Sequence, residues 1–423
     1  MPYNWNTNYK DDDNIDLGRK LVTKEYLFDI YPGLIDDYPQ NNLGISPFVW
    51  AWGANEFGQC GINDSIDRLT PSTTLITGGE WKSIAGGGYH SAGIKLNGTL
   101  WTWGLNDFGQ LGINESGGGP NFNNRSTPVT TLLGGTNWKS VKCGFKHTIA
   151  TKTDGTLWLW GNNENGQLGV HNITSRSTPV TTLIGGNNWD QIQAAFSHNG
   201  AIKTDGTLWL WGRGDAGQMG LNTFTNAGRS TPVTTALGGT DWKTLSCGGF
   251  HNFAIKTDGS LYLWGFNEQW QLGTNTTTSR ALPVQAIDNN NNWRMAVANG
   301  YFSAAIKADG TLWTWGGRIQ ASHPINYGNM GINDSNQGRA TPVTTILGGT
   351  NWKSLVCGRE FVAALKTDGT IWAWGRNDRG QLGLNDTTSR STPVLITYNN
   401  TNWKQLSAGF YMMLGITTGD SPI

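Results

Sequence analysis

Short runs of alternating apolar and polar residues recur along most of the chain, and this period of two is typical of half-buried β-strands. The run Thr99–Trp103, for example, alternates two tryptophans with threonine and leucine. It follows a tight-turn pair, which predicts a hairpin with a type I′ turn and positive φ at both central residues. Equivalent pairs are Asn97-Gly98, Asp154-Gly155, Asp205-Gly206, Asp258-Gly259, Asp309-Gly310 and Asp368-Gly369.

Tryptophan positions show that these runs belong to a repeat. A Trp-Gly pair closes one strand of each unit, at Trp52, Trp103, Trp160, Trp211, Trp264, Trp315 and Trp374. A second tryptophan marks each unit again, at Trp81, Trp138, Trp189, Trp242, Trp293, Trp352 and Trp403. Each of the seven units contains about four predicted strands, and units of this length with four strands indicate a β-propeller.

The two ends of the repeat predict that the ring closes. The first unit starts midway, at Phe48–Gly53, without a preceding hairpin partner. The last unit, Trp403–Gly419, stops where its own tryptophan-rich strand should begin. We therefore expect Val49–Gly53 to pair with Met413–Thr417, which removes free sheet edges. The predicted fold is an all-β, closed seven-bladed propeller over residues 46–423, preceded by a docking arm over residues 1–45.

Several motifs carry a resemblance to a known family. The segments GQLG, KTDGTLWLWG and G-F-x-H-T-x-A-x-K resemble the repeats of the regulator of chromosome condensation family, whose fold is a seven-bladed propeller. The resemblance covers about Ser46–Gly419. It departs in unit six, where GGRIQASHPINYGNMG replaces a compact turn, and in unit five, where Trp270 takes a glycine position.

The arm contains a different pattern. Within Asp16–Tyr38, apolar residues recur near helical spacing, and Pro32-Gly33 ends the run, which predicts a short amphipathic helix. The candidate docking residues are Leu21, Tyr26, Leu27, Ile30 and Tyr31. Either this helix packs on the propeller itself, or it docks the propeller to another protein.

Composition restricts the possible partners. The chain has 30 basic and 30 acidic residues, so its net charge is about zero and no basic footprint for nucleic acid is visible. The N-terminal residues lack the pattern of a signal peptide, and no apolar run is long enough to span a membrane. Cys143, Cys247 and Cys357 share one small-residue position of the repeat, which predicts burial and no disulfide framework. No cofactor is expected.

Three repeated polar positions are candidates for chemistry. His90, His147, His198 and His251 share a position that other units fill with Phe or Met, so we expect packing with a hydrogen bond inside the blade, and metal binding is the alternative. The lysine before each hairpin pair is expected to be a solvated edge residue. A candidate surface ring comprises Arg68, Arg125, Arg176, Arg229, Arg280, Arg339 and Arg390, each in an R-x-x-P element. These arginines are expected to clip adjacent blades through carbonyls or through Asp64, Asp334 and Asp386; anion or glycan binding is the alternative.

No serine nucleophile elbow, P-loop or pair of catalytic carboxylates is present, so we expect no enzymatic activity. The tryptophan pairs recur in every unit, which favours packing over light sensing. The Asn-, Gly- and Thr-rich repeats and the arm resemble phage appendage proteins, so the first interpretation is a virion component. Its partners would be other virion proteins, bound through residues 16–38, and a host-surface receptor, and it would be made in the host cytoplasm. The alternative is a cellular regulator such as a guanine-nucleotide exchange factor for a small GTPase; a secreted inhibitor or adhesin is a third.

Overall fold

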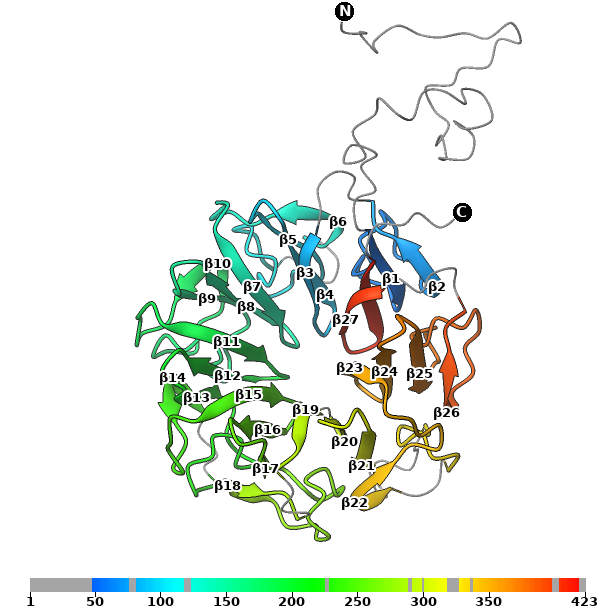
Figure 1. The fold of residues 1–423 in the computed structure, drawn as a ribbon. Coiled ribbons are helices and arrows are strands. Elements are labelled where there is room, and N and C mark those ends of the chain that lie inside the picture. The colour runs from blue at the N-terminus through cyan, green and yellow to red at the C-terminus, as the bar shows by residue number, and fades with distance from the viewer. Residues whose placement is uncertain are drawn as a thin grey trace, which may run out of the picture. The chain divides into compact units, whose positions relative to one another are not determined.

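The computed structural model describes residues 48–75, 81–117, 123–224, 228–287, 291–298, 300–317, 327–334, 338–397 and 403–417. Their regular structure is all β: 28 strands form seven four-stranded antiparallel sheets, the blades, around one axis (Figure 1). The predicted seven-bladed propeller is therefore confirmed. No helix in this part of the chain is long and apolar enough to cross a membrane.

Each blade uses its four strands in the same radial order. The innermost strands are β3 (Trp81–Gly86), β7 (Trp138–Cys143), β11 (Trp189–Ala194), β15 (Trp242–Cys247), β19 (Trp293–Ala298), β23 (Trp352–Gly358) and β27 (Trp403–Ala408). The second strands are β4 (His90–Lys95), β8 (His147–Lys152), β12 (His198–Lys203), β16 (His251–Lys256), β20 (Phe302–Lys307), β24 (Phe361–Lys366) and β28 (Met412–Thr417).

The outer half of each blade begins with a tryptophan-rich strand. The third strands are β5 (Leu100–Gly104), β9 (Leu157–Gly161), β13 (Leu208–Gly212), β17 (Leu261–Gly265), β21 (Leu312–Gly316), β25 (Ile371–Gly375) and β1 (Val49–Gly53). The outermost strands are β6 (Arg125–Thr130), β10 (Arg176–Thr181), β14 (Arg229–Thr234), β18 (Arg280–Gln285), β22 (Arg339–Thr344), β26 (Arg390–Leu395) and β2 (Arg68–Thr73).

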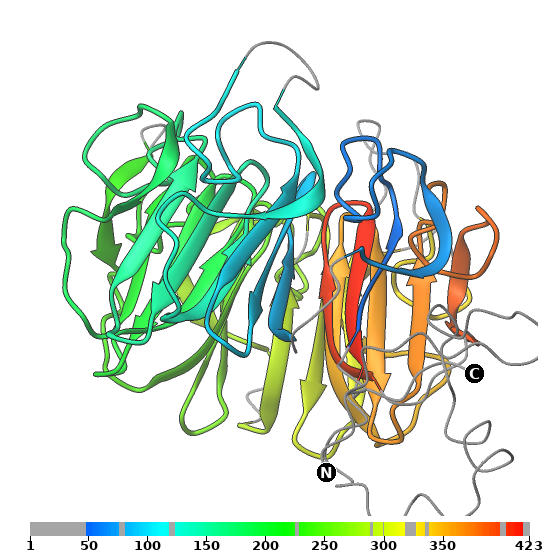
Figure 2. The same cartoon turned by 90° about the horizontal axis from the view of Figure 1, so that it is seen from above.

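The blades present two faces, which Figure 2 shows from the side. We call the loop face the end at which the innermost strands finish; it carries the loops from the first to the second strand and from the third to the outermost strand. We call the hairpin face the opposite end, where the innermost strands start and the second and third strands are joined by Asp-Gly or Asn-Gly turns. Because neighbouring strands are antiparallel, each position of the repeat lies on the same face in every blade.

Ring closure follows the sequence prediction. β1 pairs antiparallel with β28, with Val49 opposite Ile416 and Trp52 opposite Met413. The closing blade therefore has strands from both ends of the repeat, in the order β2-β1-β28-β27.

The tryptophan of each Trp-Gly pair holds neighbouring blades together. These side chains are fully buried, and the indole Nε1 of each donates a hydrogen bond to a backbone carbonyl in the preceding blade. Trp211 donates to Gln167 O at 2.9 Å and Trp264 to Gln218 O at 2.8 Å. The same bond recurs from Trp52, Trp103, Trp160, Trp315 and Trp374. A buried indole N–H requires such an acceptor. At each blade boundary the same tryptophan therefore fills the apolar contact and makes the hydrogen bond that its N–H needs.

The hairpin turns differ from the predicted type I′ geometry. Positive φ occurs at the glycine, such as +80° at Gly155, but not at the preceding Asp154. Gly155 N bonds Lys152 O, and Lys152 N bonds Thr156 O. This is a three-residue loop that ends with glycine in the left-handed region. Asp154 accepts hydrogen bonds from the N–H and hydroxyl of Thr156, which stabilises the turn without positive φ at the aspartate.

The turn glycine also lies against the segment that leads into the next blade at Gly98, Gly155, Gly206, Gly259 and Gly310. A Cβ at Gly155 would come 1.8 Å from Asn187 O, whereas a Cβ at Gly185, which also has positive φ (+56°), would meet no atom within 4 Å. We expect Gly185→Ala to cost only the left-handed backbone strain of about 1–2 kcal/mol. Gly155→Ala should cost that strain plus an overpacking penalty of about 1–3 kcal/mol. Urea unfolding of the two variants measures the difference; equal losses would show that the close approach is unimportant.

Candidate functional site

Aromatic side chains converge on the axis at the loop face. Phe145, Phe196 and Phe410 come from three different blades, and all three are half-buried. The Phe145 ring lies 4.2 Å from that of Phe196 and 4.8 Å from that of Phe410, measured between centroids. Phe250 and Tyr301 continue this aromatic surface, with centroids 6.2 Å apart. We call these five residues the aromatic mouth; a cavity of about 310 Å³ lies beneath them in the channel.

The backbone fixes the aromatic mouth in place. Phe410 N donates to Gly87 O at 3.0 Å, and Phe145 N donates to Ala195 O at 3.2 Å, so each loop is bonded to a neighbouring blade. At Gly88 the absence of a side chain is required, because a Cβ there would approach Phe145 O to 2.3 Å. The aromatic rings therefore project from rigid supports rather than from long loops.

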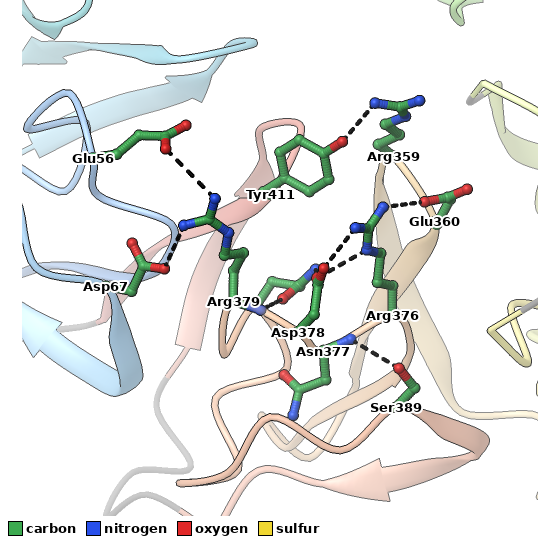
Figure 3. Close-up of polar contacts among 11 residues, drawn as sticks. Glu56, Asp67, Arg359, Glu360, Arg376, Asn377, Asp378, Arg379, Ser389 and Tyr411 are labelled. Carbon is green, nitrogen blue, oxygen red and sulfur yellow. Dashed lines mark hydrogen bonds and ion pairs between the residues drawn. The ribbon is translucent and has the colours of Figure 1, made fainter.

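Figure 3 shows a network of charged residues, and its Arg359 contacts Phe410 of the aromatic mouth. Arg376 donates to Asp378 from Nε at 2.8 Å and from Nη2 at 2.5 Å, and to Glu360 from Nη1 at 2.7 Å. Its guanidinium also lies 5.1 Å from the centre of the Tyr411 ring. Glu360 is only 7% exposed, so its charge is compensated mainly by Arg376.

Protonation in this network is fixed by the pairing. Burial disfavours the charged form of Arg376, but its hydrogen bonds to Asp378 and Glu360 outweigh this effect and raise its pKa. Burial likewise opposes ionisation of Asp378, but hydrogen bonds from Arg376 and Gln381 hold its pKa below the usual value. Both residues are charged at neutral pH.

Two further arginines extend the network. Arg379 contacts Asp67 at 3.1 Å and Glu56 at 3.5 Å, which links β25–β26 to the closing blade. Arg359 donates to the Tyr411 hydroxyl at 2.5 Å and lies 5.8 Å from the Phe410 ring centre. We call Arg359, Arg376 and Arg379 with their partners the arginine network. It connects directly to the aromatic mouth through Phe410.

The four histidines are buried, as the repeat predicts, but their hydrogen bonds leave their own blade. His147 Nε2 lies 2.8 Å from Asn199 Oδ1 and His251 Nε2 lies 2.9 Å from Ser303 Oγ, each in the next blade. His90 and His198 make the same kind of contact. The prediction of a bond inside the blade was therefore wrong. In the described part of the chain no group of three or more His, Cys, Asp or Glu is arranged to hold a metal ion.

The arginines of the predicted surface ring begin the outermost strands, far from the axis. Arg68, Arg339 and Arg390 do pair with Asp64, Asp334 and Asp386. Each pair lies within one loop, however, and does not bridge two blades. The blades are joined there instead by backbone bonds from left-handed loop residues, such as Asn114 N to Ser177 O at 2.9 Å.

The lysines before the turns are not simple solvated edges. The Nζ atom of Lys152 lies 5.0 Å from the Trp138 ring centre and 4.9 Å from that of Trp158, within cation–π distance of both. The same arrangement, with the lysine near two aromatic rings, recurs at Lys95, Lys203, Lys256, Lys307 and Lys366.

The predicted docking segment cannot be compared with the structure. Residues 16–38, with Leu21, Tyr26, Leu27, Ile30 and Tyr31, lie outside the described residues, as does most of the segment 318–328.

Sequence reasoning did not select the aromatic mouth or the arginine network. The available signal is the pair of positions just before the histidine slot, which vary from Gly88-Tyr89 to Arg359-Glu360 while their surroundings repeat. Positions that vary within an otherwise constant repeat are not fixed by the packing that all blades share, and they are therefore candidates for function.

Comparison with known proteins identifies the family. A profile described as an RCC1-like domain matches residues 46–298, and two profiles of the regulator of chromosome condensation (RCC1) repeat match residues 352–381 and 368–414. The chain belongs to the RCC1-like family. The family resemblance inferred from the repeats is thus confirmed.

Several proteins with similar sequences have names that describe a receptor or a regulator. The chain is 28% identical to the ultraviolet-B receptor UVR8 of Arabidopsis thaliana, over 82% of this chain and 77% of that protein. It is 29% identical to the secretion-regulating guanine nucleotide exchange factor of Bos taurus, over 79% and 75% respectively. Yeast RCC1 (Prp20), solved bound to Kap60, has the same fold, with a TM-score of 0.77 at 19% identity over 89% of this chain and 90% of that chain. These proteins lend no support to the virion interpretation.

The buried histidines predict how stability depends on pH. Burial lowers the pKa of His251 to about 3 and that of His147 to about 4, so both are neutral in the folded protein. The unfolded chain, with histidine pKa values near 6.5, binds more protons as the pH falls. Stability is therefore full above about pH 6.5 and should fall by about 1–2 kcal/mol per histidine down to pH 5. Urea unfolding at pH 7 and pH 5 measures this loss.

The variant His251→Phe provides the control, because Phe302 and Phe361 fill the same slot in β20 and β24. It should remove about a quarter of the histidine contribution to the pH dependence, since one of four equivalent groups is gone. An unchanged difference between pH 7 and pH 5 would mean that His251 does not take up a proton on unfolding.

Proposed function

We propose that this protein is a non-catalytic regulator that binds a protein partner on its loop face, and that the partner is a small GTPase whose guanine nucleotide it helps to release. The observation that carries the proposal is the aromatic mouth with the arginine network beside it. Half-buried Phe145, Phe196, Phe250 and Phe410 form a central apolar area, and Arg359 joins it to charged groups.

This arrangement matches the anatomy of protein–protein interfaces. Such interfaces have a core enriched in aromatic residues and arginine, surrounded by a polar rim. Residues of these types also dominate the binding free energy when they lie at the centre of the contact. The backbone bonds between blades keep the rings in position before binding, which reduces the entropy lost on association.

Nucleotide exchange is compatible with a surface that has no catalytic groups. An exchange factor and a nucleotide that bind a GTPase each weaken the affinity of the other, because the coupling between two sites is reciprocal. The protein then needs only to bind the nucleotide-free GTPase more tightly than the loaded form. The exchange-factor relative from Bos taurus supports this candidate over the virion interpretation.

The other candidates have less support. The name of the Arabidopsis relative suggests light reception, but the rings of the aromatic mouth are Phe and Tyr, and the Trp-Gly tryptophans are buried in blade packing. Docking through residues 16–38 and binding of a host receptor stay predictions that no observation here tests.

The exchange proposal is tested with a panel of small GTPases loaded with a fluorescent GDP analogue. We expect this protein to accelerate nucleotide release from one of them. Phe196→Ala and Arg359→Ala should each reduce the acceleration by about ten-fold or more, because central aromatic and arginine residues contribute about 2 kcal/mol or more to binding.

Thr344→Ala is the matched control, because Thr344 is exposed at the end of β22 on the hairpin face. It should leave the exchange rate unchanged. If the folded protein accelerates release from no GTPase in the panel, or if Phe196→Ala and Arg359→Ala retain full activity, the proposal is wrong.

A further inference from the structure

The hairpin face has a ring of cations around the axis. Each innermost strand starts with its marker tryptophan, and the next residue is basic in six of the seven blades. These residues are Lys82, Lys139, Lys243, Arg294, Lys353 and Lys404. All are exposed except Lys139, which is partly exposed. The seventh blade has Asp190 at this position. We call these six cations the basic ring.

Contacts between neighbouring blades show that the members of the ring lie side by side. Lys139 Nζ lies 2.8 Å from Asp190 Oδ1 in the next blade. Arg294 donates from Nη1 to Lys353 O at 2.9 Å, again across a blade boundary. Asp190, which is the one carboxylate at this position of the repeat, is already paired with Lys139. Of the six cations, Arg294 lines the cavity in the channel, and Lys82, Lys243, Lys353 and Lys404 are exposed at the starts of their strands.

The channel that the ring surrounds is also lined by basic side chains. A cavity of about 380 Å³ occupies it, lined by Arg294 and Lys142 and by polar groups that include Gln193, Ser246 and Ser407. Among the described residues, no Asp or Glu lines this cavity. Burial lowers the pKa of Lys142, since desolvation is not offset by a carboxylate. An anion in the cavity would restore the charged form.

The surroundings of the ring restrict the size of the anion. The hairpin tips farther from the axis carry exposed carboxylates, at Asp154, Asp205, Asp258, Asp309 and Asp368. A nucleic acid duplex lying across this face would meet these charges, whereas a compact ligand at the axis would meet the six cations and one carboxylate, Asp190, which Lys139 already neutralises. Lysine binds phosphate as a point charge and needs no fixed geometry, which suits a ring of lysines around a small ligand.

We propose that the basic ring and the channel form a binding site for a compact, multiply phosphorylated small molecule. The ligand lies on the axis at the hairpin face, with phosphates on the ring and one phosphate directed toward Lys142. The basic ring lies at the opposite end of the channel from the aromatic mouth, and this proposal does not depend on the function proposed for the loop face.

Isothermal titration calorimetry of the full chain with inositol hexakisphosphate tests the proposal. We expect one molecule bound per chain, with an affinity that falls as salt increases. The exposed double variant Lys353→Gln/Lys404→Gln should weaken binding by about ten-fold or more, because two nearby charges are lost. Lys142→Met should also weaken it. Asp190→Asn should tighten it, since the only carboxylate of the ring position is removed.

Arg125→Gln/Arg390→Gln is the matched control, because it removes two cations from the outermost strands at the loop face. It should leave the affinity unchanged. Equal weakening in both double variants would show non-specific charge attraction and overturn the proposal. So would the absence of binding at about millimolar probe, or tighter binding of a polyglutamate peptide or of duplex DNA than of the probe. Lys353 and Lys404 are exposed, so their double variant decides the question even if Lys142→Met fails to fold.

Discussion

The hydrogen bond from each buried indole to a carbonyl of the preceding blade is the interaction on which this propeller depends. A carbonyl such as Gln167 O is buried, and its desolvation is compensated only by donors of the next blade, Trp211 Nε1 and Asn199 Nδ2. Each loop therefore acquires its stable conformation through its neighbour, and the bond from Trp52 to Gln381 O completes the circle. The pairing of β1 with β28 places Trp52 at the last blade boundary, and an open ring would leave that boundary without this contact.

The features that could be predicted from the sequence are those that packing repeats. Strand alternation, blade number and closure all follow from tryptophans that recur because each blade buries the same surface. The hairpin geometry was predicted wrongly because an Asp-Gly pair fits both a two-residue and a three-residue loop; the pairing of Lys152 with Thr156 decides between them. The histidine partners were assigned to the wrong blade because a repeat period contains no information on which neighbour a side chain reaches, as Asn199 does for His147.

The candidate sites could not be predicted because they lie where the repeat does not constrain the residue. At the aromatic mouth, glycine at one blade makes room for phenylalanine at the next, as Gly88 does for Phe145, so the site exists only as a combination of unlike loops. The arginine network joins residues more than 300 positions apart, such as Arg379 and Asp67. The basic ring was missed for a different reason: a single cation in six of the seven units does not stand out in a sequence whose net charge is zero.

A propeller converts position within the repeat into position on a face, and this explains how a neutral chain can present two different surfaces. A residue that follows the marker tryptophan, such as Lys353, always lies at the hairpin face near the axis, whereas a residue that follows the innermost strand, such as Arg359, always lies at the loop face. Positive and negative charges that cancel in the net charge of the chain are thereby separated in space.

On the loop face, arginines are largely paired with carboxylates, as Arg376 is with Asp378 and Glu360, so their electric field is local and favours a specific protein contact. On the hairpin face the cations near the axis are mostly without carboxylate neighbours, so their fields add and attract an anion. The two faces can therefore present different chemistry to different partners, although one channel connects them: Cys143, Ala194 and Cys247 line both of its cavities.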